Sequence, residues 1–223
     1  MGSVEPAGIR YVRPIRPLHF PASDPEWEMG EGKRHQLLCE LLRQILAAAA
    51  GEGSSVGSDQ FLYFDASNPQ RKCAPDGFVK LGVPDELFDT WKTWEKGTPE
   101  LCVEILSPSD TREKLPLEEK LARFHVMGVA EVVAFDAEAP VGRRLRAWDL
   151  VDGDLVERIV ENESTPCRTL DRWFVIAPCS NPTLEAALRV AEDAKGQRLV
   201  RSPLESALEE VERLKAERAR PDE

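Results

Sequence analysis

PELCVEILS, residues 99–107, is the most informative stretch of this 223-residue chain. It is a short run of β-forming residues bracketed by Pro99 and Pro108, which is typical of a buried strand. Glu104 lies in the middle of this apolar run. An ionised carboxylate in a buried strand is costly unless it is paired or binds a metal. The sequence therefore predicts that another group compensates the charge of Glu104.

A helix and a second strand follow this run. Pro116 suits the first position of a helix, and Gly128 suits its end. The next apolar run, AEVVAFD at residues 130–136, is again rich in β-forming residues. We therefore expect residues 99–136 to form a βαβ unit with two parallel strands and a right-handed crossover.

Further helical and extended segments surround this unit. Apolar residues at helical spacing predict a helix over residues 33–50. Residues 55–68 and 73–82 each contain a candidate strand, and residues 144–160 suit a hairpin that turns at an Asp-Gly pair. This mixture of helices and strands predicts an α/β fold.

The two ends of the chain differ from its middle. Residues 1–32 hold five prolines and no periodic apolar face, which predicts an extended N-terminal arm. Residues 33–178 carry the segments above and form the predicted main domain. Residues 179–223 contain two helix-start signals, Asn181-Pro182 and Ser202-Pro203, so we expect a C-terminal helical extension with two helices.

Composition argues against several classes of protein. A net charge of −11, from 29 basic and 40 acidic residues, argues against a broad basic surface, so any contact with DNA must be local. The longest unbroken apolar stretch, residues 45–50, is far too short for a membrane span. The N-terminus lacks the apolar core of a signal peptide, so we expect a cytoplasmic protein. Five cysteines without a CxxC pair argue against a disulfide framework and against structural zinc.

A second carboxylate accompanies Glu104. Asp76 follows Pro75 and precedes an apolar pair, so it can project from a strand that enters the same sheet. Two carboxylates on neighbouring strands can hold a hard divalent cation, with waters as the remaining ligands. The same Pro-Asp-Gly triplet is equally a turn signature. His35 has no ligand partner at metal spacing and is interpreted as a packing or surface residue.

Three blocks, in this order, resemble the Uma-two family of restriction endonucleases, a branch of the PD-(D/E)xK nuclease superfamily. The blocks are APDGFV (74–79), PELCVEILSPSDT (99–111) and EKLARFHVMGVAEVVAFD (119–136). The resemblance spans roughly residues 33–178. It implies a restriction-endonuclease-like mixed β-sheet flanked by helices. It also implies an endonuclease that hydrolyses phosphodiester bonds in DNA with Mg²⁺ or Mn²⁺.

The resemblance also implies a catalytic site. Asp76 and Glu104 would be the metal ligands. The superfamily pattern has a lysine two residues after the motif glutamate, on the same face of the strand, but this chain has Leu106 there. The Uma-type branch commonly carries its lysine on the next helix, where this chain has Lys120. The alternative interpretation of Lys120 is a solvated lysine on the helix surface.

Two other functions fit the same sequence. The first is a catalytically silent nuclease fold that serves as a binding or regulatory module, favoured by the acidic charge and by Leu106. The second is a homodimeric assembly protein, because the helix predicted over 203–219 has an apolar stripe that needs a partner on its own domain or on a second copy. Glu40, on the first helix, could add a carboxylate to the site or be surface charge.

Overall fold

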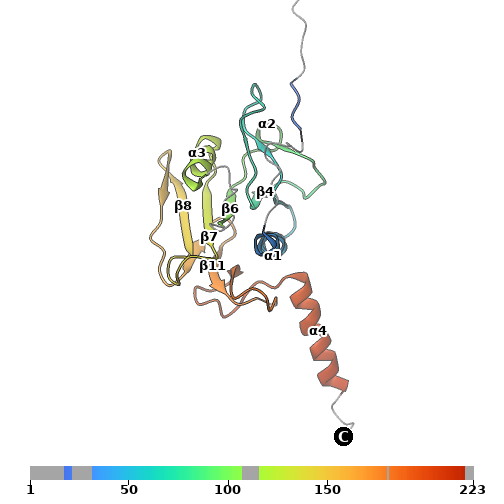
Figure 1. The fold of residues 1–223 in the computed structure, drawn as a ribbon. Coiled ribbons are helices and arrows are strands. Elements are labelled where there is room, and N and C mark those ends of the chain that lie inside the picture. The colour runs from blue at the N-terminus through green and yellow to red at the C-terminus, as the bar shows by residue number, and fades with distance from the viewer. Residues whose placement is uncertain (1–17, 22–31, 107–115, 180, 219–223) are drawn as a thin grey trace, which may run out of the picture.

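The computed structural model describes residues 18–21, 32–106, 116–179 and 181–218. Its centre is a six-stranded sheet with the order β1 (Ser54–Gly57), β4 (Gly77–Leu81), β6 (Leu101–Leu106), β7 (Glu131–Asp136), β8 (Leu145–Val151) and β9 (Asp154–Glu157) (Figure 1). β6 and β7 run parallel, whereas the other neighbouring pairs of this sheet are antiparallel. The sheet is therefore mixed, as predicted.

The predicted βαβ unit is confirmed. β6 and β7 align with Glu104 opposite Ala134, and α3 (Leu117–Met127) connects them. Pro116 is the N-cap of α3 rather than its first helical residue. Gly128 follows the helix with a φ of 79°, a left-handed conformation that glycine adopts because it has no Cβ. The predicted hairpin is also confirmed, as β8 and β9.

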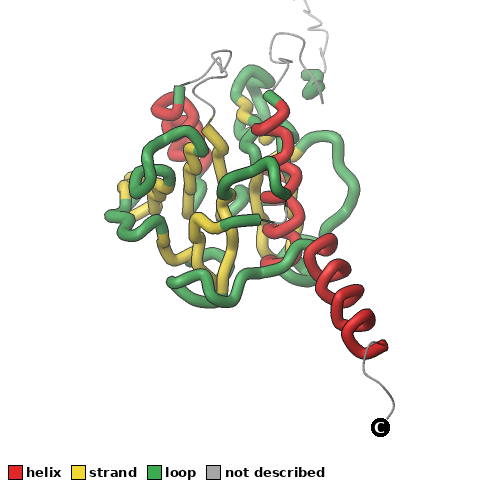
Figure 2. Tube along the Cα trace, turned by 60° about the horizontal axis from the view of Figure 1, so that its bottom comes forward, coloured by secondary structure: helices red, strands yellow, loops and turns green. Residues whose placement is uncertain are grey.

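Helices cover both faces of the central sheet. α1 (Lys33–Ala50) lies across one face (Figure 2). Its apolar side chains pack in a cluster with Val103 and Ile105. α3 packs in the cluster that contains Cys102, on the other face. Side chains alternate along a strand, so β6 presents Val103 and Ile105 to α1 and Cys102 and Glu104 to α3. This is the predicted arrangement of a mixed sheet flanked by helices.

Two smaller sheets complete the fold. The first contains β10 (Ser164–Cys167), β11 (Arg172–Ala177) and β12 (Ala187–Ala191), with antiparallel pairing. The second contains β3 (Lys72–Cys73), β2 (Leu62–Tyr63) and β5 (Trp91–Lys92), and it is followed by the short helix α2 (Thr93–Lys96).

The helix predicted from Asn181-Pro182 is wrong. Residues 187–191 instead form β12, which pairs with β11 and packs against α1. This segment contains good helix formers, but Leu188 and Val190 are buried in the core. Pairing with β11 and this burial outweigh the local helix propensity. Of the two predicted C-terminal helices, the part of the chain that the structure describes therefore contains only the second, α4 (Pro203–Arg218).

The start of α4 is held by its predicted capping box. The backbone N–H of Glu205 donates to Ser202 Oγ at 3.2 Å, and the backbone N–H of Ser202 donates to Glu205 Oε2 at 2.9 Å. Glu205 also forms a buried ion pair with Arg189 of β12, with 2.7 Å between Nη2 and Oε2. Beyond this anchored first turn, the helix extends away from the sheets (Figure 1).

Of the predicted N-terminal arm, the structure describes residues 18–21, which form neither helix nor strand. The Phe20 ring meets the Tyr63 ring edge-on, with 5.1 Å between centroids. The Tyr63 hydroxyl donates to the carbonyl of Pro21 at 2.7 Å. This short piece therefore lies against β2.

Candidate active site

Glu104 and Lys120 are brought together by the packing of α3 on the sheet. Nζ of Lys120 donates to Glu104 Oε2 at 2.7 Å. The Glu104 side chain is 1% exposed and the Lys120 side chain is 15% exposed. Lys120 therefore compensates the buried carboxylate and also reaches towards solvent. It is not a solvated surface lysine.

Two buried thiols, those of Cys73 and Cys102, lie near Glu104. Burial raises the pKa of the Cys73 thiol well above its ordinary range, and the negative charge of Glu104 raises it further. The pKa of the Cys102 thiol is raised too, chiefly by burial. Both thiols therefore stay neutral beside the carboxylate. In such a low-dielectric environment, opposite charges interact more strongly than they do in water.

Asp76 lies immediately before β4, next to Glu104 in the sheet. Gly77 of β4 is paired with Val103 of β6. Oδ2 of Asp76 accepts the backbone N–H of Ile105, the residue after Glu104, at 2.5 Å. Asp76 is 5% exposed, so it is a second buried carboxylate at the same end of β6. The Pro75-Asp76-Gly77 triplet is therefore a bend that leads into β4.

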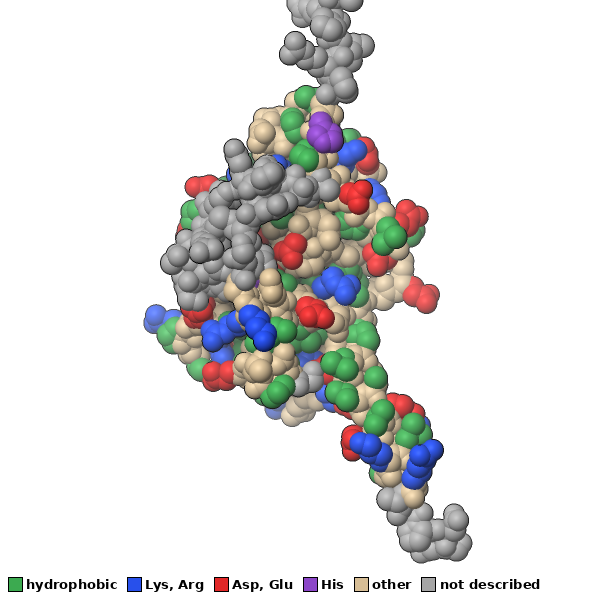
Figure 3. All heavy atoms as spheres, turned by 45° about the vertical axis from the view of Figure 1, so that its right-hand side comes forward, with side chains coloured by type: hydrophobic (Ala, Val, Ile, Leu, Met, Phe, Trp, Pro, Cys, Tyr) green, Lys and Arg blue, Asp and Glu red, His purple; other side chains and the backbone are tan. Residues whose placement is uncertain are grey.

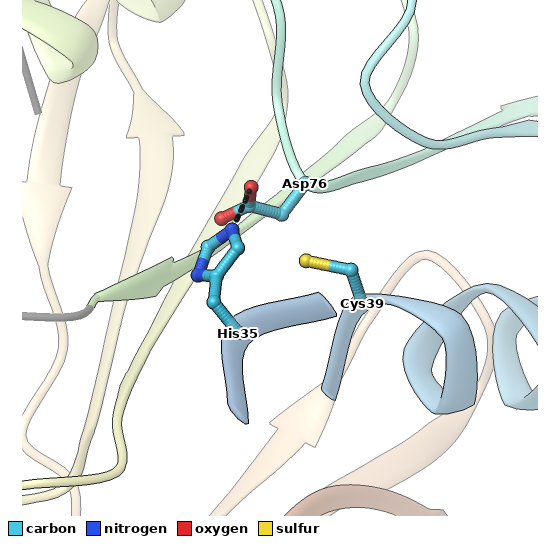
Figure 4. Close-up of side chains that lie close together, drawn as sticks. All are labelled: His35, Cys39 and Asp76. Atoms are coloured by element: carbon cyan, nitrogen blue, oxygen red, sulfur yellow. Dashed lines mark hydrogen bonds and ion pairs between the residues drawn. The ribbon is translucent and has the colours of Figure 1, made fainter. Parts of the chain in front are cut away.

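The other oxygen of Asp76 meets α1. Oδ1 lies 3.2 Å from His35 Nε2, and Cys39 stands beside this pair (Figure 4). His35 and Cys39 are 6% and 5% exposed. Sequence reasoning missed both residues. Their separation of four positions on one helix was the available signal, because such residues share a helix face.

Glu40 does not face this cluster. It is exposed on α1, whereas its neighbour Cys39 points into the core. Adjacent helical residues point about 100° apart, so these two side chains cannot both face Asp76.

Asp76 and Glu104 are the residues that would hold the divalent cation implied by the sequence. Both supply carboxylate oxygens, which are the ligands that Mg²⁺ and Mn²⁺ prefer. Both are buried, Glu104 on β6 and Asp76 immediately before the neighbouring strand β4, so these two residues supply the type of ligand that such an ion needs. That the two carboxylates share one ion stays a prediction.

A mixed sheet between helices, with Glu104 on β6 and Asp76 immediately before β4, is a restriction-endonuclease-like fold. The chain matches the Uma2 family, described as "Putative restriction endonuclease", over residues 26–178, and it belongs to this family.

The chain is similar to a solved structure. It is described as the "Crystal structure of a putative nuclease belonging to DUF820 from Anabaena variabilis ATCC 29413 at 1.96 A resolution". The two share 13% identity with a TM-score of 0.47, over 65% of this chain and 76% of that one. No curated protein matches the chain.

Proposed function

We propose that this protein is a Mg²⁺- or Mn²⁺-dependent endonuclease that hydrolyses phosphodiester bonds in DNA. The observation that supports this best is the Lys120–Glu104 pair beside Asp76, because it joins a lysine and two buried carboxylates at one end of β6. Membership of the Uma2 family supports the nuclease class.

Each of the three residues has a proposed role. Asp76 and Glu104 bind the cation, which when bound lowers the pKa of a water molecule and stabilises charge on the phosphate. Lys120 orients the attacking water with its ammonium group, which is the most exposed group of the three residues. In this proposal Lys120 takes the place of the lysine in the superfamily pattern, because α3 packs on the sheet and its Lys120 contacts Glu104 of β6.

DNA contact is proposed to be local. The chain has a net charge of −11, so its average field repels the phosphate backbone. Cation binding between the two carboxylates would reduce this repulsion at the site itself. Affinity for DNA should therefore depend on the divalent cation.

Cleavage of supercoiled plasmid with Mg²⁺ or Mn²⁺ tests the proposal, with a chelator and the Glu104→Gln variant as controls. We expect nicked or linear product only in the parent with metal. Product that survives both controls would come from a contaminant, and a parent that never cleaves contradicts the proposal.

A second candidate is a silent module with the same fold. The observation that favours it is the same ion pair, because Lys120 neutralises Glu104 without any cation. In this case the parent would bind neither Mg²⁺ nor Mn²⁺ in a calorimetric titration and would not cleave DNA.

We also propose that α4 joins two copies of the chain. Glu205 is the only buried residue in the described part of this helix. The apolar stripe of the helix is exposed and consists of Leu204, Leu208, Val211 and Leu214. Figure 3 shows this helix projecting from the body with apolar side chains on its surface. The first ten residues of α4 carry only acidic charges, whereas its last six carry all three basic residues of the helix and one acidic residue. An antiparallel pair would cover the stripe and place acidic halves beside basic halves.

A cytoplasmic location stays a prediction. Among the residues that the structure describes, no helix is long and apolar enough to cross a membrane.

A further inference from the structure

We propose that His35, Cys39 and Asp76 form a binding site for a transition-metal cation such as Zn²⁺. This site lies on the α1 side of the sheet, whereas Glu104 and Lys120 lie on the α3 side. Asp76 meets His35 of α1 through Oδ1 and accepts the backbone N–H of Ile105 of β6 through Oδ2. The inference does not depend on nuclease activity, because it rests on the three donor atoms alone.

The three donor atoms already lie close together. One ring nitrogen, one thiol sulfur and one carboxylate oxygen are within 4.8 Å of one another, and all three residues are buried. His35 Nε2 and Asp76 Oδ1 are 3.2 Å apart. Two ligands at this separation, each about 2.1 Å from an ion, subtend an angle of about 100° at it. This angle is close to the tetrahedral value that Zn²⁺ prefers.

The fold holds these groups in place before any ion binds. His35 and Cys39 are four residues apart on α1, so they share one face of the helix. α1 is fixed against the sheet by the buried side chains of Leu42 and Leu46. Gly77 allows this close approach, because a Cβ there would lie 3.0 Å from carbon atoms of both leucines.

Asp76 is oriented from the opposite direction. The backbone N–H of Ile105 donates to its Oδ2, which directs Oδ1 towards His35 (Figure 4). A hydrogen bond of this kind to the second oxygen of a ligand is the usual outer support of a metal site. The aspartate is therefore positioned by β6 and faces α1.

The donor set selects the type of metal. Nitrogen, sulfur and oxygen donors together suit Zn²⁺ or Co²⁺, whereas Mg²⁺ requires oxygen ligands. Three protein ligands leave a fourth position for water. Cys39 would bind the ion as its thiolate and release the thiol proton. Zn²⁺ bound here would also compete with Mg²⁺ for Asp76.

Titration of the reduced, metal-free full chain with Co²⁺ tests the site. We expect one equivalent to produce a thiolate-to-cobalt absorption band in the near ultraviolet, which Zn²⁺ then removes by displacement. Cys39→Ser should abolish the band and weaken Zn²⁺ binding more than tenfold, since even outer-shell changes cost 10- to 100-fold. Cys179→Ser is the matched control and should keep the band, because Cys179 lies outside the cluster.

Further measurements separate this inference from the nuclease proposal. Glu104→Gln should keep the Co²⁺ band even if it abolishes cleavage. Zn²⁺ should raise the melting temperature of the parent but not that of folded Cys39→Ser, because a ligand stabilises the state that binds it. The inference is wrong if the parent gives no thiolate band, or if the band persists in Cys39→Ser. Either result would leave His35 as a residue that only orients Asp76.

Discussion

Nζ of Lys120 lies 2.7 Å from Oε2 of Glu104, although the two residues are 16 positions apart and belong to a helix and a strand. The ammonium group of Lys120 therefore neutralises the buried carboxylate of Glu104 on β6, the strand whose Ile105 contacts Asp76.

Lys120→Ala should lower metal-dependent DNA cleavage by at least about tenfold, a loss of about 1.4 kcal/mol of transition-state stabilisation. The reason is the loss of the ammonium group that orients the attacking water. Calorimetry should show nearly unchanged affinity for Mg²⁺. Lys195→Ala changes an exposed lysine and is the matched control. Cleavage at the parental rate by Lys120→Ala would remove the lysine from the mechanism.

Glu104→Gln and Asp76→Asn should each abolish the heat of Mg²⁺ binding in a calorimetric titration. Each change keeps the shape of the side chain and removes a charged oxygen ligand. Glu40→Gln should bind Mg²⁺ as the parent does, because Glu40 is exposed on α1. Parental Mg²⁺ affinity in both site variants would contradict a metal shared by Asp76 and Glu104.

Leu208→Asp with Val211→Asp should halve the sedimentation mass if α4 joins two copies. Charges in the stripe would be buried without partners in the pair but would face water in the monomer. Leu87→Asp alters an apolar residue that is fully exposed elsewhere and should leave the mass unchanged. A parent that already sediments as a monomer would refute the proposed pair.

Glu205→Ala should lower the free energy of unfolding by about 3–5 kcal/mol, because it leaves the charge of Arg189 buried and unpaired. The change also removes half of the capping box. Urea unfolding followed by circular dichroism measures the effect. Glu209→Ala, at an exposed position one turn later, should stay within about 0.5 kcal/mol of the parent.

Asp149 should make the protein sensitive to acid. Hydrogen bonding from Arg158 is the main cause that lowers the pKa of Asp149 below its ordinary value of 3.8. A carboxylate with a lowered folded-state pKa stabilises the fold above its unfolded pKa, and this contribution is lost as the pH falls through the folded value. The parent should therefore exceed Asp149→Asn in unfolding free energy at pH 7, and the difference should shrink below about pH 4.

Asp154→Asn is the control for this prediction, because Asp154 is exposed on β9. This variant should lose stability in acid as the parent does, because it keeps the contact between Arg158 and Asp149. A gap between parent and Asp149→Asn that stays constant down to pH 2 would show that the Arg158 contact does not depend on the charge of Asp149.

Local sequence was sufficient for the central part of the fold. The βαβ unit, α1, the β8–β9 hairpin and α4 follow from apolar periodicity, from prolines and glycines at their ends, and from the capping box of Ser202 and Glu205. These signals act between residues that are near one another in the chain. The apolar strand around Glu104 likewise required a compensating group, and α3 supplied it.

β12 and the contact between His35 and Asp76 depend on segments that are far apart in the chain. Residues 187–191 contain helix formers, yet they form β12 because β11 offers them hydrogen bonds and α1 offers them a buried surface. His35 and Asp76 are 41 positions apart, and no local pattern shows that they meet. The packing of α1 on the sheet brings them together, since burial of its apolar face determines which of its polar residues turns inwards.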